Sequence, residues 1–107
     1  MKVLRGDKVA WFDVDDTLIL WSKEGKYALG DCKYDIHEAH VELIKEFHAR
    51  GHRVVVWSQG GYRWACKAVK LLDISKYVDL VMSKPEWVFD DKPSSKWMPP
   101  VDYLENA

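Results

Sequence analysis

The sequence has few of the features that assign a chain to a class at once. It holds only two cysteines among 107 residues, and its 16 basic and 17 acidic residues leave a formal net charge of -1. Two thiols, Cys32 and Cys66, predict reduced structural cysteines rather than a disulfide framework. The balanced charge argues against a dedicated electrostatic nucleic-acid binder, although it is compatible with a local basic groove.

Long apolar runs are also missing. The longest, such as residues 9–12 and 54–57, are far shorter than the roughly 18 residues that a membrane span needs, so we expect no membrane partner. Residues 1–7 contain no apolar signal-peptide core, which predicts a cytoplasmic protein. A chain of this size has room for one hydrophobic core, and we expect a single domain over residues 1–107 with a loose C-terminal tail at about 93–107.

Short apolar stretches rich in Val and aromatic residues predict four strands. They are brief and end in polar clusters, which favours buried strands over helices. The predicted strands cover residues 8–13, 53–57, 78–82 and 87–89.

Two amphipathic helices are expected between the first three strands. Asp35 is predicted to cap the first helix, whose apolar side chains recur every three or four residues, and Gly51 to end it. The second helix follows the turn at Gly60 and Gly61. This alternation predicts an α/β domain of Rossmann-like form, with three layers and a mainly parallel sheet joined by right-handed crossovers.

Polar side chains follow every predicted strand. In a parallel sheet the carboxyl ends of the strands share one edge, so these side chains should meet in a crevice. Carboxylates that converge there need a cation, and Mg²⁺ suits a site that also binds phosphate. A lysine would help to neutralise a phosphate dianion so that a carboxylate can attack phosphorus. The clusters are Asp13–Asp15–Asp16–Thr17, Ser58–Gln59, Ser83–Lys84 and Asp90–Asp91–Lys92.

The first cluster resembles the D-x-D-x-T signature of the haloacid dehalogenase-like phosphatases. The resemblance spans about residues 8–92: an apolar strand ending in Ser58 is similar to the second signature, Lys84 to the third, and Asp90 with Asp91 to the fourth. It implies an enzyme that hydrolyses phosphomonoesters through an aspartyl-phosphate intermediate.

The resemblance also implies roles for individual residues. Asp13 would be the nucleophile and Asp15 the general acid and base. Ser58, Gln59 and Lys84 would bind phosphate, with Lys92 as the competing lysine because Lys84 and Asp90 lie only six positions apart. Mg²⁺ would be held by four residues, namely Asp13, Asp15, Asp90 and Asp91.

A short flap at about residues 19–35 is implied in place of a cap domain, since no segment is long enough to form one. An open site suits a large phosphorylated substrate such as a nucleic-acid end or a phosphoprotein, or else a nucleotide; a small metabolite would require closure by a neighbouring subunit. The flap aromatics could stack a nucleobase or simply anchor the flap. They are Trp21, Tyr27 and Tyr34, accompanied by Lys23, Lys26 and Lys33.

Two other classes of protein compete with the phosphatase. One is a catalytically silent phosphate-binding or interaction module, and the other is a signalling receiver, which lacks its phosphoacceptor here because Ser58 ends the second strand. His37 and His40 are spaced by three residues rather than the four of a metalloprotease helix, which predicts capping or solvated side chains. Trp97 and Tyr103 are expected to pin the tail to the body or to contact a partner.

Overall fold

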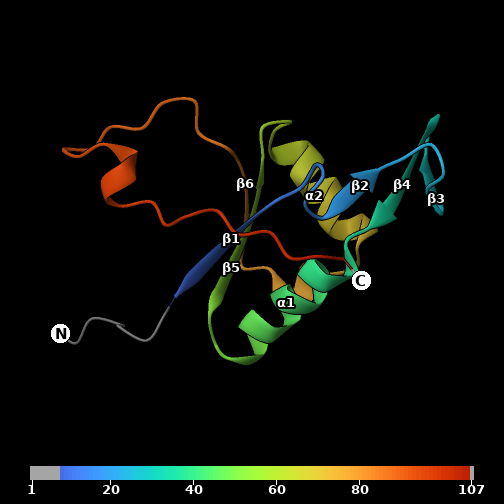
Figure 1. The fold of residues 1–107 in the computed structure, drawn as a ribbon, viewed down its shortest axis with the longest axis horizontal. Coiled ribbons are helices and arrows are strands. Elements are labelled where there is room, and N and C mark those ends of the chain that lie inside the picture. The colour runs from blue at the N-terminus through green and yellow to red at the C-terminus, as the bar shows by residue number, and fades with distance from the viewer. Residues whose placement is uncertain (1–7, 107) are drawn as a thin grey trace.

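A parallel sheet of three strands lies at the centre of the computed structural model, which describes residues 8–106. Its strands are β1 (Val9–Asp13), β5 (Arg53–Ser58) and β6 (Leu80–Ser83), in the order β1-β5-β6 (Figure 1). The first three predicted strands are confirmed, although β6 begins two residues later than expected. The prediction about a signal peptide concerns residues 1–7, which lie outside the described residues.

Two helices connect these strands and pack on one face of the sheet. They are α1 (Glu38–Ala49) and α2 (Tyr62–Leu71), and both crossovers step in the same direction across the sheet. Right-handed crossovers of this kind place both helices on the same face, and Figure 1 shows both to the right of the strands. Val54 and Val56 point to that face, where they are fully buried. The predicted third layer is wrong for residues 8–106, because no α-helix among them covers the opposite face.

The opposite, outer face of the sheet is apolar and partly exposed. Trp11, Val55 and Leu80 occupy neighbouring positions in the register and share this face. Trp11 is 46% exposed and Leu80 is 52% exposed, whereas Val55 is buried between them. The Trp11 ring packs against Trp57 with 4.4 Å between ring centroids. The core therefore fills only one side of the sheet.

A small antiparallel sheet occupies the segment predicted to form a flap. It consists of β2 (Ile19–Trp21), β3 (Tyr27–Leu29) and β4 (Cys32–Ile36), in the order β2-β4-β3. The prediction that Asp35 caps α1 is wrong, because Asp35 lies in β4 and its carboxylate accepts a bond from the Lys26 backbone N–H at 3.0 Å. His37 caps the helix instead, and Gly51 ends it with φ of 81°, as expected.

The chain after β6 leaves the sheet as an arm of residues 84–98. The strand predicted at residues 87–89 is wrong: this segment pairs with no strand, and Trp87 and Phe89 are 76% and 94% exposed. A run of three apolar residues can form few ladder bonds, and here the chain has turned away from the free edge of β1 (Figure 1). The only regular element of the arm is one 3₁₀ turn at Ser94–Lys96, and another 3₁₀ turn, at Ser75–Tyr77, precedes β6.

The tail returns to the body and docks on two buried histidines. His37 and His40 stack with 3.6 Å between ring centroids, and Tyr103 stands edge-on against both rings. The Leu104 backbone N–H donates to Nε2 of His40 at 2.9 Å, while the Leu104 carbonyl lies 2.8 Å from Nε2 of His37. Tyr103 therefore pins the tail, as expected. The histidines are not solvated, since both rings are buried.

Both ring nitrogens of His40 form hydrogen bonds that require the neutral imidazole. Because the Leu104 N–H can only donate, Nε2 carries no proton, and Nδ1 must donate to the Thr17 carbonyl 2.6 Å away. Burial lowers the pKa of His40; the bond to Thr17 opposes this shift, and the neighbouring His37 adds to it. A proton on Nε2 would face the Leu104 N–H and break the anchor of the tail.

This arrangement predicts a loss of stability in mild acid. The folded pKa of His40 lies below its unfolded value of 6.5, so the unfolded chain takes up the proton first as the pH falls. The contribution of His40 is complete above about pH 6.5 and declines below it. Urea unfolding at about pH 7.5 and 5.5 should show this decline in the wild type and a smaller one in His40→Asn. His48→Asn, on the exposed side of α1, is the control, and an undiminished decline in His40→Asn would contradict the assignment.

Candidate active site at the carboxyl edge of the sheet

The three parallel strands end together and deliver polar residues to one edge. Asp13 closes β1 beside Trp57, and Ser58 at the end of β5 pairs with Ser83 at the end of β6. Lys84 follows at once, and its backbone N–H donates to the Ser58 carbonyl at 2.9 Å. Parallel pairing thus brings together three of the four predicted clusters.

Asp13 contacts two of its expected companions. Nζ of Lys84 lies 3.2 Å from Oδ1 of Asp13, and the Thr17 hydroxyl donates to Oδ2 at 3.3 Å. The Asp13 and Lys84 side chains are each about one-third exposed, at 32% and 30%, so a ligand in solvent can reach them. Lys92, the competing lysine, pairs with Asp91 at 3.5 Å within the arm. Lys84 is therefore the lysine that faces Asp13.

A tight turn after β1 aims the next carboxylate. The Val14 carbonyl accepts backbone N–H groups from Thr17, Leu18 and Ile19 at 2.9 to 3.2 Å. Asp16 adopts the left-handed region with φ of 63°, which Asp tolerates better than most residues. The turn fixes Asp15 on the side of the sheet that carries the flap and α2.

Two tryptophans hold Asp15, although no local sequence pattern predicts this contact. Nε1 of Trp21 donates to Oδ1 at 2.8 Å, and Nε1 of Trp64 donates to Oδ2 at 3.2 Å. Trp21 belongs to the predicted flap, and Trp64 belongs to the helix predicted after Gly60 and Gly61. The one usable signal is a general rule: a packed indole N–H needs a hydrogen-bond acceptor, and the acidic cluster after β1 offers several.

Neither Ser58 nor Gln59 has its side chain free at the site to bind phosphate in this structure. Ser58 is fully buried, and its hydroxyl accepts the Gly60 N–H at 2.9 Å and reaches Oδ2 of Asp15 at 3.5 Å. Gln59 is exposed in the turn that follows. The expected role of Ser58 as a phosphate ligand would require its hydroxyl to change partners.

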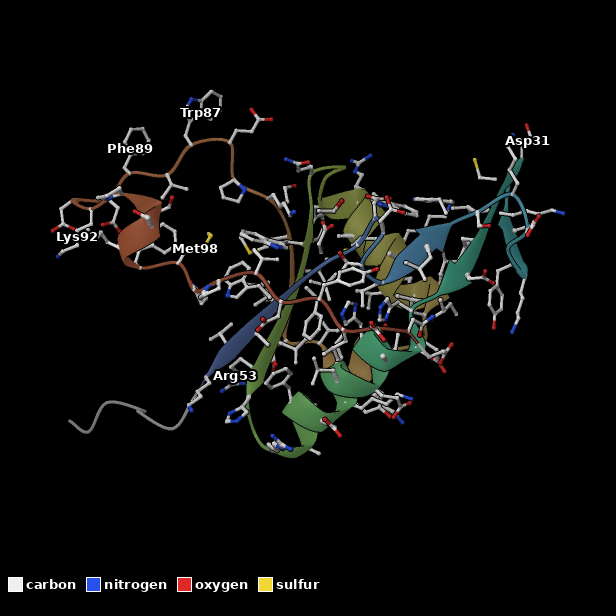
Figure 2. The ribbon with its side chains drawn as sticks, viewed as in Figure 1. Asp31, Arg53, Trp87, Phe89, Lys92 and Met98 are labelled. Carbon is white, nitrogen blue, oxygen red and sulfur yellow. The ribbon has the colours of Figure 1, made fainter. Side chains whose placement is uncertain are left out.

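Asp90 and Asp91 lie away from Asp13, which corrects the expected metal-ligand set. Both are exposed in the arm, and Figure 2 shows their neighbours Phe89 and Lys92 far to the left of the strands. Asp90 lines a hollow of about 390 Å³ formed only by residues 86–98. Its pKa is lowered chiefly by the Lys92 backbone N–H and then by the Asp91 side chain. Asp90 and Asp91 lie away from the site because residues 87–89, which precede them, do not join the sheet.

The described residues do not assemble the full metal site. Within residues 8–106, no group of three or more His, Cys, Asp or Glu side chains is arranged to hold a metal ion. Of the four expected Mg²⁺ ligands, only Asp13 and Asp15 share the carboxyl edge of the sheet. Binding of Mg²⁺ beside Asp13 therefore stays a prediction from the sequence.

Comparison of the chain with protein-family models, curated proteins and solved structures found no match. No helix among residues 8–106 combines the length and apolar character that crossing a bilayer requires. The chemistry of the site is therefore the basis for assigning a function.

A side chain at position 60 is predicted to destabilise the protein, because Trp64 packs against the backbone of Gly60. A Cβ at Gly60 would lie 2.9 Å from Cδ1 of Trp64 and 3.3 Å from the Ser58 hydroxyl. Gly60→Ala should lower the free energy of unfolding by about 1–3 kcal/mol, the usual cost of overpacking. Chemical denaturation in a Trp64→Ala background should show a much smaller cost. Equal costs in both backgrounds would place the strain elsewhere.

Proposed function

We propose that this protein is a phosphatase that hydrolyses phosphomonoesters through an aspartyl-phosphate on Asp13. The observation that carries the proposal is the 3.2 Å contact between Lys84 and the reachable carboxylate of Asp13. A carboxylate attacks a phosphate dianion only if nearby positive charge offsets their repulsion. Lys84 supplies that charge at the atom that reacts.

The chemistry proceeds in two displacements. An Asp13 oxygen bonds to phosphorus while the ester P–O bond breaks, and the leaving oxygen takes a proton from Asp15. Water then attacks phosphorus, Asp15 recovers a proton from that water, and the acyl-phosphate bond breaks to release inorganic phosphate. The cycle returns Asp13 as the carboxylate and Asp15 as the protonated acid, and it consumes one water molecule. Asp15 suits this role because it lies two residues from Asp13 and follows the same strand.

Mg²⁺ stays a prediction from the sequence. Asp90 and Asp91 are not at the site, so no step of the proposal runs through the ion. A divalent cation would supply additional charge neutralisation if the arm delivered further ligands. Assays with added Mg²⁺ and with EDTA decide whether the reaction needs it.

The flap favours a large phosphorylated substrate. No cap domain covers Asp13 among residues 8–106, and the flap carries a groove of about 490 Å³ beside Trp21. Lys23 and Lys33 line this groove together with the tryptophan. An aromatic face with two flanking cations suits a base and its phosphates. We therefore propose a nucleic-acid end or a nucleotide as the substrate class.

One observation favours a second candidate, a catalytically silent phosphate-binding or interaction module. The displacement of Asp90 and Asp91, together with the burial of Ser58, leaves the expected machinery incomplete. Such a module would bind phosphate at Lys84 without turnover. Turnover is thus the property that separates the two functions.

Replacing the nucleophile tests the proposal directly. Asp13→Asn should reduce hydrolysis of an aryl phosphate by about a thousand-fold or more, since the amide cannot form the acyl phosphate. Asp16→Asn is the matched control: it makes the same change of charge in the same turn, and Asn tolerates the left-handed conformation.

The same pair should be assayed on phosphorylated oligonucleotides, nucleotides, phosphopeptides and sugar phosphates. We expect the highest kcat/KM for nucleic-acid ends or nucleotides. A preference for sugar phosphates would contradict the substrate class and favour a small-metabolite enzyme closed by oligomerisation. Full activity in Asp13→Asn would refute the nucleophile.

The two candidate lysines can be separated by matched substitutions. Lys84→Met should lower kcat/KM by about 100-fold, because the charge beside Asp13 is lost. Lys92→Met removes the same charge from the arm and should leave kcat/KM within about twofold. Steady-state kinetics on the best substrate provide the measurement. A larger loss in Lys92→Met would mean that the arm, not Lys84, serves the reaction.

A further inference from the structure

The Asp15 carboxylate accepts hydrogen bonds from two indoles, an arrangement that we name the indole clamp (Trp21, Asp15 and Trp64). Trp21 comes from β2 in the flap and Trp64 from α2, and each donates its N–H to a different carboxylate oxygen. The two rings are stacked with 5.8 Å between centroids and 23° between planes. Elements remote in sequence therefore converge on one side chain.

Packing alone does not account for this geometry. Stacked tryptophans fill space equally well with their N–H groups directed to water, yet here both N–H groups point to one carboxylate. Two donors on different oxygens stop the carboxylate from rotating about its terminal bond, which is otherwise a soft torsion. The remaining donor, the Ser58 hydroxyl, is 3.5 Å away and contributes little by comparison.

The clamp is itself supported on both sides. Trp64 packs against Gly60, where a Cβ would lie only 2.9 Å from the indole. Trp21 meets the buried Tyr34 edge-on at 5.9 Å, and Tyr34 stacks on Tyr27 at 5.4 Å. The flap is thereby tied to α2 through the side chain of Asp15.

We propose that Trp21 and Trp64 are positioning residues that aim the Asp15 carboxylate for proton transfer at the phosphate held by Asp13. This inference rests on the proposed function, and it assigns the flap a task beyond enclosing the substrate. Proton transfer requires an oxygen within about 3 Å of the leaving group, so a freely rotating carboxylate loses rate rather than affinity.

The first experiment detects the two indole hydrogen bonds to Asp15 by NMR and needs no activity assay. In the ¹H–¹⁵N spectrum of the labelled protein, the six tryptophans contribute indole N–H signals, which Trp21→Phe, Trp64→Phe and Trp87→Phe assign. Asp15→Asn should shift the Trp21 and Trp64 signals, because an NH₂ group, which does not accept, replaces one of the two acceptor oxygens. The Trp87 signal, from the exposed arm, should stay in place. Unmoved Trp21 and Trp64 signals would overturn the clamp.

The second experiment measures how the loss of each indole N–H changes kcat. Trp21→Phe and Trp64→Phe keep an aromatic ring but remove the indole N–H. On an aryl phosphate, which does not need the groove beside Trp21, each should lower kcat by about tenfold or more while KM changes little. Trp87→Phe should keep the wild-type kcat. Unchanged kcat in both clamp variants would overturn the positioning role. Trp21 is 36% exposed, so Trp21→Phe keeps the test open even if Trp64→Phe fails to fold.

The two experiments separate the two proposals. A wild-type protein without phosphatase activity on every substrate overturns the proposed function, and with it the positioning role, while the indole signals still decide the clamp itself. Activity that depends on Asp13 but not on either indole upholds the proposed function and overturns only this inference.

Discussion

The parallel pairing of β1 with β5 is the constraint on which the rest of the site depends. Its register sets Asp13 beside Trp57 and so places the end of β1 next to Ser58. Parallel strands need a crossover, and this chain uses it to carry both the flap and α1. A shift of one residue would turn Asp13 toward the helices and Phe12 toward solvent. One ladder thus decides both the core and the position of the nucleophile.

The turn after β1 converts that backbone register into a chemical site. The N–H groups of Thr17, Leu18 and Ile19 all donate to one carbonyl. The Asp13 carboxylate next to this turn contacts Lys84, and the Asp15 carboxylate within it contacts the two indoles. The tail completes the support, because Tyr103 donates to the Asp16 carbonyl at 2.9 Å and His40 holds Thr17. Residues more than 80 positions apart therefore stabilise the same short loop.

The elements that sequence reasoning recovered are those specified by local pattern. The apolar runs of β1, β5 and β6 place Asp13 and Lys84 at one edge of the sheet, where their side chains are in contact. Residues 87–89 show the limit: their apolar pattern is that of a strand, but a strand also needs a partner edge within reach. His37 in place of Asp35 as the helix cap, like the donors to Asp15, depends on contacts between distant segments.

The uncovered face of the sheet affects how this domain responds to heat. Unfolding raises the heat capacity mainly by wetting apolar surface, typically by about 1.2–1.5 kcal/mol/K per 100 residues. Trp11 and Leu80 already lie half in water in the folded chain, as do the apolar side chains of the arm. These side chains therefore add little to the heat-capacity change of unfolding. The stability curve of this domain is therefore expected to be flatter against temperature than its length suggests, with shallow warm and cold limbs.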